Sequence, residues 1–196
     1  MEPEEFETEK LKTEKLKIEK LVIEAKNRNP DAFDRLMQTQ MQRMYRIAIA
    51  MLQNEEDAAD AIQETVLRCW EKIGQLKSTA YFQTWLTRIL INQCKDILRS
   101  RKRFVLTEDM QELSGMPHMT QEDAYSNVEW KQIMSSLDEK YRIVLELYYM
   151  EGFSTKEIAD MLHITDMNVR SRMVRARKQL GQVLQADVGE YQGGYL

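Results

Sequence analysis

Glycine, proline, cysteine and histidine are all scarce in this sequence of 196 residues, which has seven, three, two and two of them. Few glycines and prolines argue against a fold built from many short strands and tight turns. Apolar residues recur every three to four positions wherever a period is visible, so we predict an all-α protein. With two histidines, no Gly-rich phosphate loop and no carboxylates clustered around a nucleophile, we expect no enzyme, no metal ion and no other cofactor.

The two cysteines, Cys69 and Cys94, lie within helical patterns and lack CxxC spacing. We interpret both as packing residues whose thiols stay reduced in the cytoplasm. Long apolar runs are also missing, since none approaches the roughly 18 residues that a membrane-spanning helix needs. The first residues alternate acids with lysines, so we expect neither a secretory signal nor membrane insertion.

The chain divides into two small helical domains. The first covers residues 29–103 and contains three predicted helices, and the second covers residues 125–185. Residues 104–124 have no clear period and include Gly115 and Pro117, so we predict a flexible linker there.

Segments outside these domains are highly charged or rich in glycine. Residues 1–28 read as a charged helical extension, in which a TEKLK repeat spreads Leu11, Leu16 and Leu21 around the helix. Without a continuous apolar stripe, we expect this helix to be solvated. Residues 186–196 are predicted to be a disordered tail.

The second domain contains the spacing of a helix-turn-helix. Ser154 and Glu157 match a capping box, His163 lies in the turn, where we expect a packing or capping role, and Asp166 begins the next helix. The outward face of that helix carries Arg170, Ser171, Val174, Arg175 and Lys178. Arginine can read guanine edges and serine or lysine can hold phosphates, which favours the DNA major groove over a merely solvated basic face.

The third helix of the first domain carries a basic stripe. Its members are Arg88, Asn92, Lys95, Arg99 and Lys102, with Arg103 at the end. Tyr81, Phe82 and Trp85 lie just before this stripe, and such a combination suits phosphate neutralisation beside unstacked bases. Phe82 and Trp85 could equally anchor the core, whereas we expect Tyr81 at the surface.

The second helix of the first domain has an acidic outward face. That face consists of Asp57, Asp60, Gln63, Glu64 and Glu71. Phosphates would repel it, so we interpret it as a contact for a basic protein surface, with a purely solubilising face as the alternative.

At this point the sequence resembles an extracytoplasmic-function (ECF) bacterial sigma factor of the sigma-70 family. The matching blocks occur in the family's order and read DAADAIQETVLRCWEKI, YFQTWLTRILINQCKDILRSRKR and LDEKYRIVLELYYMEGFSTKEIADMLHITDMNVRSRMVRARKQL. The resemblance implies a sigma region 2 helical bundle at residues 29–103, which binds core polymerase and the minus-10 element. It also implies a sigma region 4 helix-turn-helix at residues 125–185, which reads the minus-35 element.

The resemblance assigns functional residues by position. Asp60 and Gln63 fall on the family's DxxQ motif, in a core-polymerase-binding set of Asp57, Asp60, Gln63, Glu64 and Leu67. The implied minus-10 set comprises Lys77, Tyr81, Arg88, Asn92, Lys95, Arg99, Lys102 and Arg103. The VRSR block begins at Val169, and the implied minus-35 set comprises Arg170, Ser171, Val174, Arg175 and Lys178.

The implied function is a sigma factor that directs promoter recognition, melting and transcription initiation at a specific regulon, as in a stress response. Its implied partners are core RNA polymerase, through the β′ clamp helices and the β flap, promoter DNA and an anti-sigma factor. Two alternatives remain on the residues alone: a dimeric helix-turn-helix regulator that acts without polymerase, and a helical adaptor that sequesters a protein.

Overall fold

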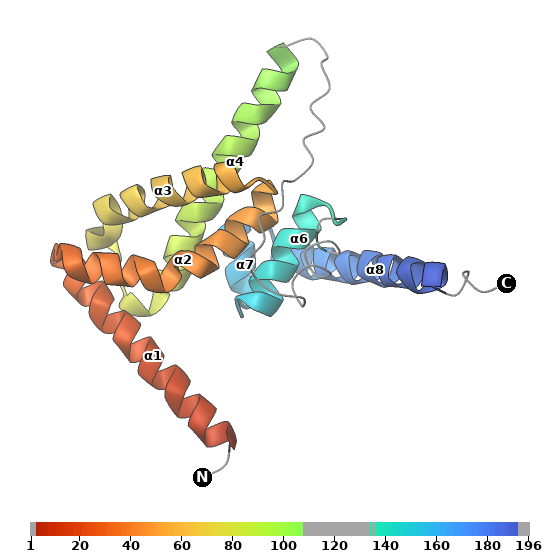
Figure 1. Ribbon diagram of the computed structural model, residues 1–196. Coiled ribbons are helices and arrows are strands. Elements are labelled where there is room, and N and C mark those ends of the chain that lie inside the picture. The colour runs from red at the N-terminus through yellow and green to blue at the C-terminus, as the bar shows by residue number, and fades with distance from the viewer. Residues whose placement is uncertain (1–2, 108–133, 135, 192–196) are drawn as a thin grey trace.

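The computed structural model describes residues 3–107, 134 and 136–191, with only the helical backbone described at 3–12, 14, 102–107 and 183–191. The helices are α1 (Pro3–Lys26), α2 (Pro30–Leu52), α3 (Glu55–Lys72), α4 (Phe82–Thr107), α6 (Glu139–Leu145), α7 (Thr155–Leu162) and α8 (Asp166–Tyr191) (Figure 1). Two short 3₁₀ turns, η1 (Ile73–Gln75) and η2 (Thr79–Tyr81), connect α3 to α4, and a π-helical turn, η3 (Glu146–Met150), follows α6. Regular structure in the described residues is helical throughout, which confirms the all-α prediction.

Helix α2 lies at the centre of the molecule. Its N-terminus is capped by Asn29, whose side chain accepts a hydrogen bond from the backbone N–H of Ala32 at 3.2 Å, and Pro30 occupies the first helical position. The helix ends at Gln53, which adopts the left-handed conformation with φ 50°. Because α2 contacts α1, α3 and α4 as well as α6 and η3, it connects the first unit, residues 3–107, to the second unit, residues 134–191.

The final turns of α1 belong to the core, which corrects the prediction of a solvated helix. Its apolar contacts come from Ile18, Leu21, Val22 and Ala25, of which Val22 and Ala25 are fully buried. These positions have the i, i+3, i+4, i+7 spacing of one helix face. The prediction considered only the repeated leucines, and it holds for the exposed Leu16. A hydrogen bond also joins α1 to the segment before α4, because Lys26 Nζ donates to the backbone oxygen of Leu76 at 2.6 Å.

Helix α4 is buried on a wider face than one apolar stripe predicts. Leu86 and Leu90 are buried, and Cys94 is buried as predicted, but Ile91 is also inaccessible although it lies off the face that Leu86 and Leu90 share. The wider face follows from an arrangement that periodicity cannot reveal, because α4 packs on α7 of the second unit as well as on α2 and α3.

Two helices extend past the predicted domain ends. The backbone of α4 continues to Thr107, into the linker predicted at 104–124, and the rest of that linker lies outside the described residues. The backbone of α8 continues to Tyr191, although a disordered tail was predicted from residue 186. A single glycine costs a helix only about 1 kcal/mol, so Gly189 does not end α8.

One hydrophobic core crosses both units. Val144, Leu147 and Met161 of the second unit belong to the same buried cluster as Leu36 and Ile47 of α2. A smaller cluster, which includes Ala176, lies beneath α8, and this helix runs away from the first unit (Figure 1). Among the described residues, no helix combines the length and the apolar character that crossing a membrane would require.

Candidate nucleic-acid interface

The helix-turn-helix predicted in the second unit is present. Ser154 Oγ accepts from the backbone N–H of Glu157 at 3.3 Å, and the Glu157 carboxylate accepts from the backbone N–H of Ser154 at 2.9 Å. This is the predicted capping box. Helix α7 then ends at His163, which caps it in the left-handed conformation with φ 58°. Asp166 begins α8 directly after the turn.

Helix α8 presents its predicted DNA-reading face to solvent. Val169, Met173 and Ala176 are buried underneath. Of the minus-35 set, Ser171 is half-buried and the others are exposed, namely Arg170, Val174, Arg175 and Lys178. Arg170 Nε already donates to Asp166 Oδ2 at 2.9 Å, and hydrogen bonds from Thr155 and Arg170 lower the pKa of Asp166.

The basic face of the first unit is partly accessible. Asn92 and Arg99 of α4 are exposed, and with Arg68 and Lys72 of α3 they line a shallow hollow between the two helices. Arg99 Nη1 donates to Asp96 Oδ1 at 2.9 Å, so part of its charge is balanced. The hollow therefore places several hydrogen-bond donors on one surface.

The segment before α4 and the first turns of α4 contain the three predicted aromatic side chains, with Lys77 and Arg88 on either side of them. Lys77 is exposed, and Tyr81 on η2 is 66% exposed, as predicted. Phe82 is buried in the core, and Trp85 is half-buried. Arg88 is half-buried, and its Nε has no hydrogen-bond partner within the described residues. Among this group, Lys77 and Tyr81 are the side chains accessible to a nucleic acid.

One other member of the minus-10 set, Lys95, is not displayed as expected. Lys95 Nζ donates to the backbone oxygen of Leu162, at the end of α7, at 3.2 Å. Burial and then Arg99 lower the pKa of Lys95, and Arg172 of α8 contributes to the shift. Lys102 and Arg103 lie on α4, but their side chains fall outside the described part of the chain.

The acidic face of α3 forms a second surface. Four members of the predicted set line one hollow together with residues of α4, namely Asp60, Gln63, Glu64 and Leu67. Leu67 is 61% exposed in the middle of these polar groups. Asp57 differs from the prediction that it faces outward with the other four. Its carboxylate forms an ion pair with Arg101 of α4. Its position near the N-terminus of α3 brings it opposite the end of α4.

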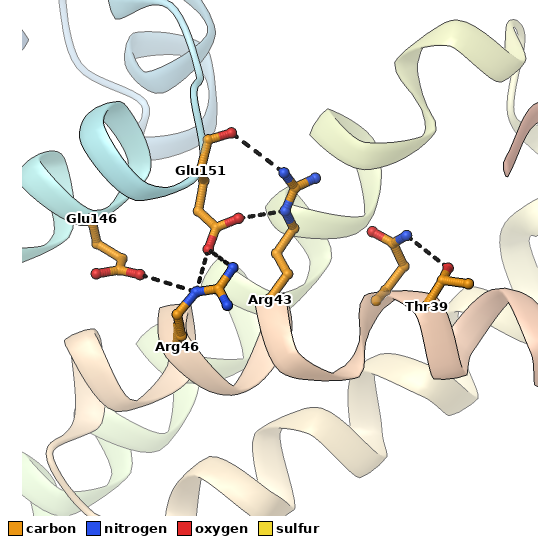
Figure 2. Close-up of polar contacts among 6 residues, drawn as sticks. Thr39, Arg43, Arg46, Glu146 and Glu151 are labelled. Carbon is orange, nitrogen blue, oxygen red and sulfur yellow. Dashed lines mark hydrogen bonds and ion pairs between the residues drawn. The ribbon is translucent and has the colours of Figure 1, made fainter. Parts of the chain in front are cut away.

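Four charged side chains join the two units, and sequence reasoning did not find them. Figure 2 shows the Glu151 carboxylate between Arg43 and Arg46 of α2. Arg43 Nε donates to Glu151 Oε2, and Arg46 Nη2 lies 2.8 Å from Glu151 Oε1. Arg46 Nε also lies 3.7 Å from Glu146 Oε1. The hydrogen-bonded residues are 105 and 108 positions apart, and no spacing rule pairs residues at that separation.

Arg142 of α6 makes a further connection between the units. Its Nε donates to the backbone oxygen of Ala50, and its Nη1 donates to the backbone oxygens of Leu137 and Met134 at 2.8 and 3.3 Å. Ala50 lies in the last turn of α2, where carbonyl groups lack helical partners and the helix dipole favours a cation. Because α2 has no basic residue in its own last turn, Arg142 supplies that cation from the other unit.

Comparison with known proteins gives matches over both units. Residues 36–104 match Sigma-70 region 2, and residues 128–180 match Sigma-70, region 4. The chain is 31% identical to the probable RNA polymerase sigma factor RfaY of Xanthomonas campestris over 154 residues, covering 74% of this chain and 38% of RfaY. It is 30% identical to the ECF RNA polymerase sigma factor SigM of Bacillus subtilis over 151 residues, covering 75% of this chain and 91% of SigM.

A solved structure has the same fold. It is the sigma factor RpoE in complex with the anti-sigma factor NepR from Bartonella quintana, with a TM-score of 0.68 and 24% identity. The match covers 79% of this chain and 98% of that chain. The helical architecture of the two units is therefore shared with a protein of similar extent.

Proposed function

Because this chain belongs to the ECF group of the sigma-70 family of RNA polymerase sigma factors, we propose that it binds bacterial core polymerase in the cytoplasm. In that complex it directs promoter recognition and melting at a specific regulon and contributes no catalytic chemistry of its own. The proposal depends mainly on one observation, which is that two adjoining faces of the first unit carry opposite charge. One is the acidic hollow at Asp60 and Gln63, and the other is the basic hollow at Asn92 and Arg99.

The acidic hollow is the proposed core-polymerase surface. Leu67 supplies an exposed apolar anchor, and Asp60 and Glu64 surround it with negative charge. Phosphates repel such a surface, whereas a basic protein surface complements it in charge. We assign it to the β′ clamp helices, and we assign the β flap to the second unit. Asp57 acts indirectly, because its ion pair with Arg101 ties α3 to α4.

Promoter DNA is assigned to two separate surfaces. Lys77, Tyr81, Asn92 and Arg99 form the proposed minus-10 surface, which combines cations with an exposed aromatic ring for an unstacked base. The exposed side chains of α8 form the proposed minus-35 surface in a major groove. Two weak, salt-sensitive contacts become strong when a polymerase connects them, because the second contact then occurs at high effective concentration.

An anti-sigma factor is the proposed inhibitory partner. The support comes from RpoE, a sigma factor of the same fold that was solved in complex with the anti-sigma factor NepR. The assignment concerns the class of partner, since the identity between the two chains is 24%.

The test is transcription in vitro with sigma-free core polymerase and fragmented genomic DNA, with mapping of the RNA 5′ ends. New start sites that share two upstream elements at a fixed spacing would support the proposal and provide the consensus. Their absence, with a control sigma factor active in the same assay, would overturn it.

A pair of variants tests the polymerase surface directly. The double variant Asp60→Lys and Gln63→Lys removes the net negative charge of the acidic hollow, so we expect it to lose co-elution with core polymerase. Glu56→Lys is the matched control, because Glu56 is exposed on the same helix, does not line the hollow and lies outside the predicted contact face. Retained co-elution of the double variant, with helical circular dichroism intact in all proteins, would remove α3 from the interface.

A further inference from the structure

We propose that a charged latch acts together with the shared apolar cluster to hold the two units of the free chain closed, and that reading a promoter requires the latch to open. The latch consists of Arg43 and Arg46 on α2 with Glu146 and Glu151 at the two ends of η3 (Figure 2). This inference rests on the proposed function, because it concerns how the proposed DNA surfaces are controlled.

The closed form holds the two DNA-reading units against each other. Thr84 Oγ1 of α4 donates to Glu157 Oε1 of α7 at 3.3 Å, and Lys95 Nζ donates to the Leu162 oxygen at 3.2 Å. Modules that read separate elements of one duplex along the same face lie about 34 Å or more apart, one helical turn. In the closed form these contacts fix the two DNA-reading units relative to each other, and Lys95 is turned towards protein instead of phosphate.

The covalent connection leaves room for opening. Residues 108–133 separate the two units along the chain, and a fully extended chain of that length spans at most about 90 Å. Noncovalent contacts, rather than chain length, therefore keep the units together. Among these contacts, the ion pairs are the ones that a charged partner can replace, because such a partner can pair with the same side chains.

The π-helical turn gives the latch its geometry. In a regular α-helix, residues five positions apart point about 140° away from each other. Here the backbone N–H of Glu151 donates to the oxygen of Glu146 at 3.1 Å, the i to i+5 bond of a π turn. Both acids are thereby brought to the side that faces α2. Arg43 and Arg46, three positions apart, share a face of α2 and meet them.

The charges are arranged so that the latch can open. The side chain of Glu151 is fully buried in the closed form, whereas those of Arg43 and Arg46 are 22% and 41% exposed. Opening returns all of them to water, so hydration offsets much of the attraction that is lost. Replacing only the two arginines has a different effect. It leaves the carboxylate of Glu151 buried and unpaired, and it does so only in the closed form.

The experiment measures the distance between the units in the full-length chain. Fluorophores are attached at Gln38→Cys on α2 and Asp160→Cys on α7, both exposed positions away from the latch. Cys69 and Cys94 are buried and free, so the introduced thiols react first. Single-molecule energy transfer then counts closed and open molecules in the free protein.

We expect the wild-type sequence to be predominantly closed and the double variant Arg43→Gln and Arg46→Gln to open. The closed-to-open ratio should fall at least about tenfold, as follows from losing one hydrogen bond to a charged group. Arg35→Gln is the matched control, since Arg35 is exposed on the same helix, and it should leave the ratio unchanged. A predominantly open wild-type chain, or an unchanged double variant, would overturn the proposal.

A third substitution separates the latch from a general loss of stability. Adding Glu151→Gln to the double variant removes the buried unpaired charge, so the triple variant should be more closed than the double variant. Simple destabilisation of either unit would make the triple variant more open, and that result would contradict the latch.

Binding of DNA by the free protein provides a second readout. A mixed-sequence single-stranded oligodeoxynucleotide should bind the double variant more tightly than the wild-type protein, by up to about tenfold, because affinity rises with the open, binding-competent fraction that energy transfer measures. Equal binding would refute the claim that closure masks DNA. If the double variant opens but the wild-type protein directs no promoter-specific transcription, only the proposed function is refuted. If the wild-type protein directs transcription normally but energy transfer in the double variant is unchanged, only the latch is refuted.

Discussion

Replacing Arg142 should destabilise the protein more than any surface substitution. The residue is 5% exposed, and its guanidinium donates to three backbone carbonyls that come from both units. Burial also lowers its pKa, and the three hydrogen bonds offset part of the cost of burying the charged guanidinium. Arg142→Met keeps the apolar stem and removes every donor.

The magnitude follows from the number of bonds. A hydrogen bond to a charged group contributes about 1.5–3 kcal/mol, and neighbouring bonds add incompletely. We therefore expect Arg142→Met to lower the free energy of unfolding by about 3–5 kcal/mol. Arg142→Lys keeps the charge but concentrates its donors on one nitrogen, so it should lose about half as much.

Urea unfolding followed by circular dichroism is the assay. The carbonyl of Ala50 belongs to α2 and those of Leu137 and Met134 to the second unit, so the same variant should also loosen the coupling between units. We expect one unfolding transition for the wild-type protein and two for Arg142→Met. A loss below about 1 kcal/mol, with a single transition retained, would refute this reasoning.

The remaining predictions concern titration, thiols and DNA reading. Burial and the neighbouring Glu151 raise the pKa of Glu146 from 4.5 to about 7, although Arg46 acts in the opposite direction. The folded protein thus holds this proton more tightly than the unfolded chain does. The free energy of unfolding should therefore fall as pH rises from about 4.5 to about 7. Glu146→Gln should remove most of this pH dependence. Burial raises the pKa of Cys69 and Cys94 to about 12, so a disulfide reagent should modify both only after unfolding, and rapid reaction in buffer would contradict the packing. Arg175→Ala should weaken minus-35 binding by the reconstituted polymerase about tenfold or more, whereas an unchanged sequence preference would reassign Arg175 to phosphate contacts.

Local signals in the sequence predicted the helix-turn-helix well. The capping box at Ser154 and Glu157 depends on residues three positions apart, and the exposed face of α8, for which DNA reading is proposed, depends on helical spacing. Both are properties of one short segment, so they can be derived without knowing what packs nearby. The exposure of Tyr81 was predicted for the same reason, since it precedes a helix whose core contact is made by Phe82.

Long-range contacts account for what the sequence did not predict. Lys95 lies on the basic stripe of α4, but α7 covers it, and nothing within α4 reveals that packing. Asp57 has the spacing of an outward-facing acid, yet Arg101 lies close enough to pair with it. The buried Glu151 looks like an ordinary surface acid in the sequence, because its partners on α2 are more than a hundred positions away.

The contribution of Arg142 to the end of α2 also limits how freely parts of related proteins can be exchanged. A chimera that joins residues 1–107 of this chain to the second half of a relative would leave the last turn of α2 without its cation, unless the relative carries an arginine at the matching position. The incoming half would also need two acids in register with Arg43 and Arg46. Parts that are separate along the chain are therefore interchangeable only as matched pairs.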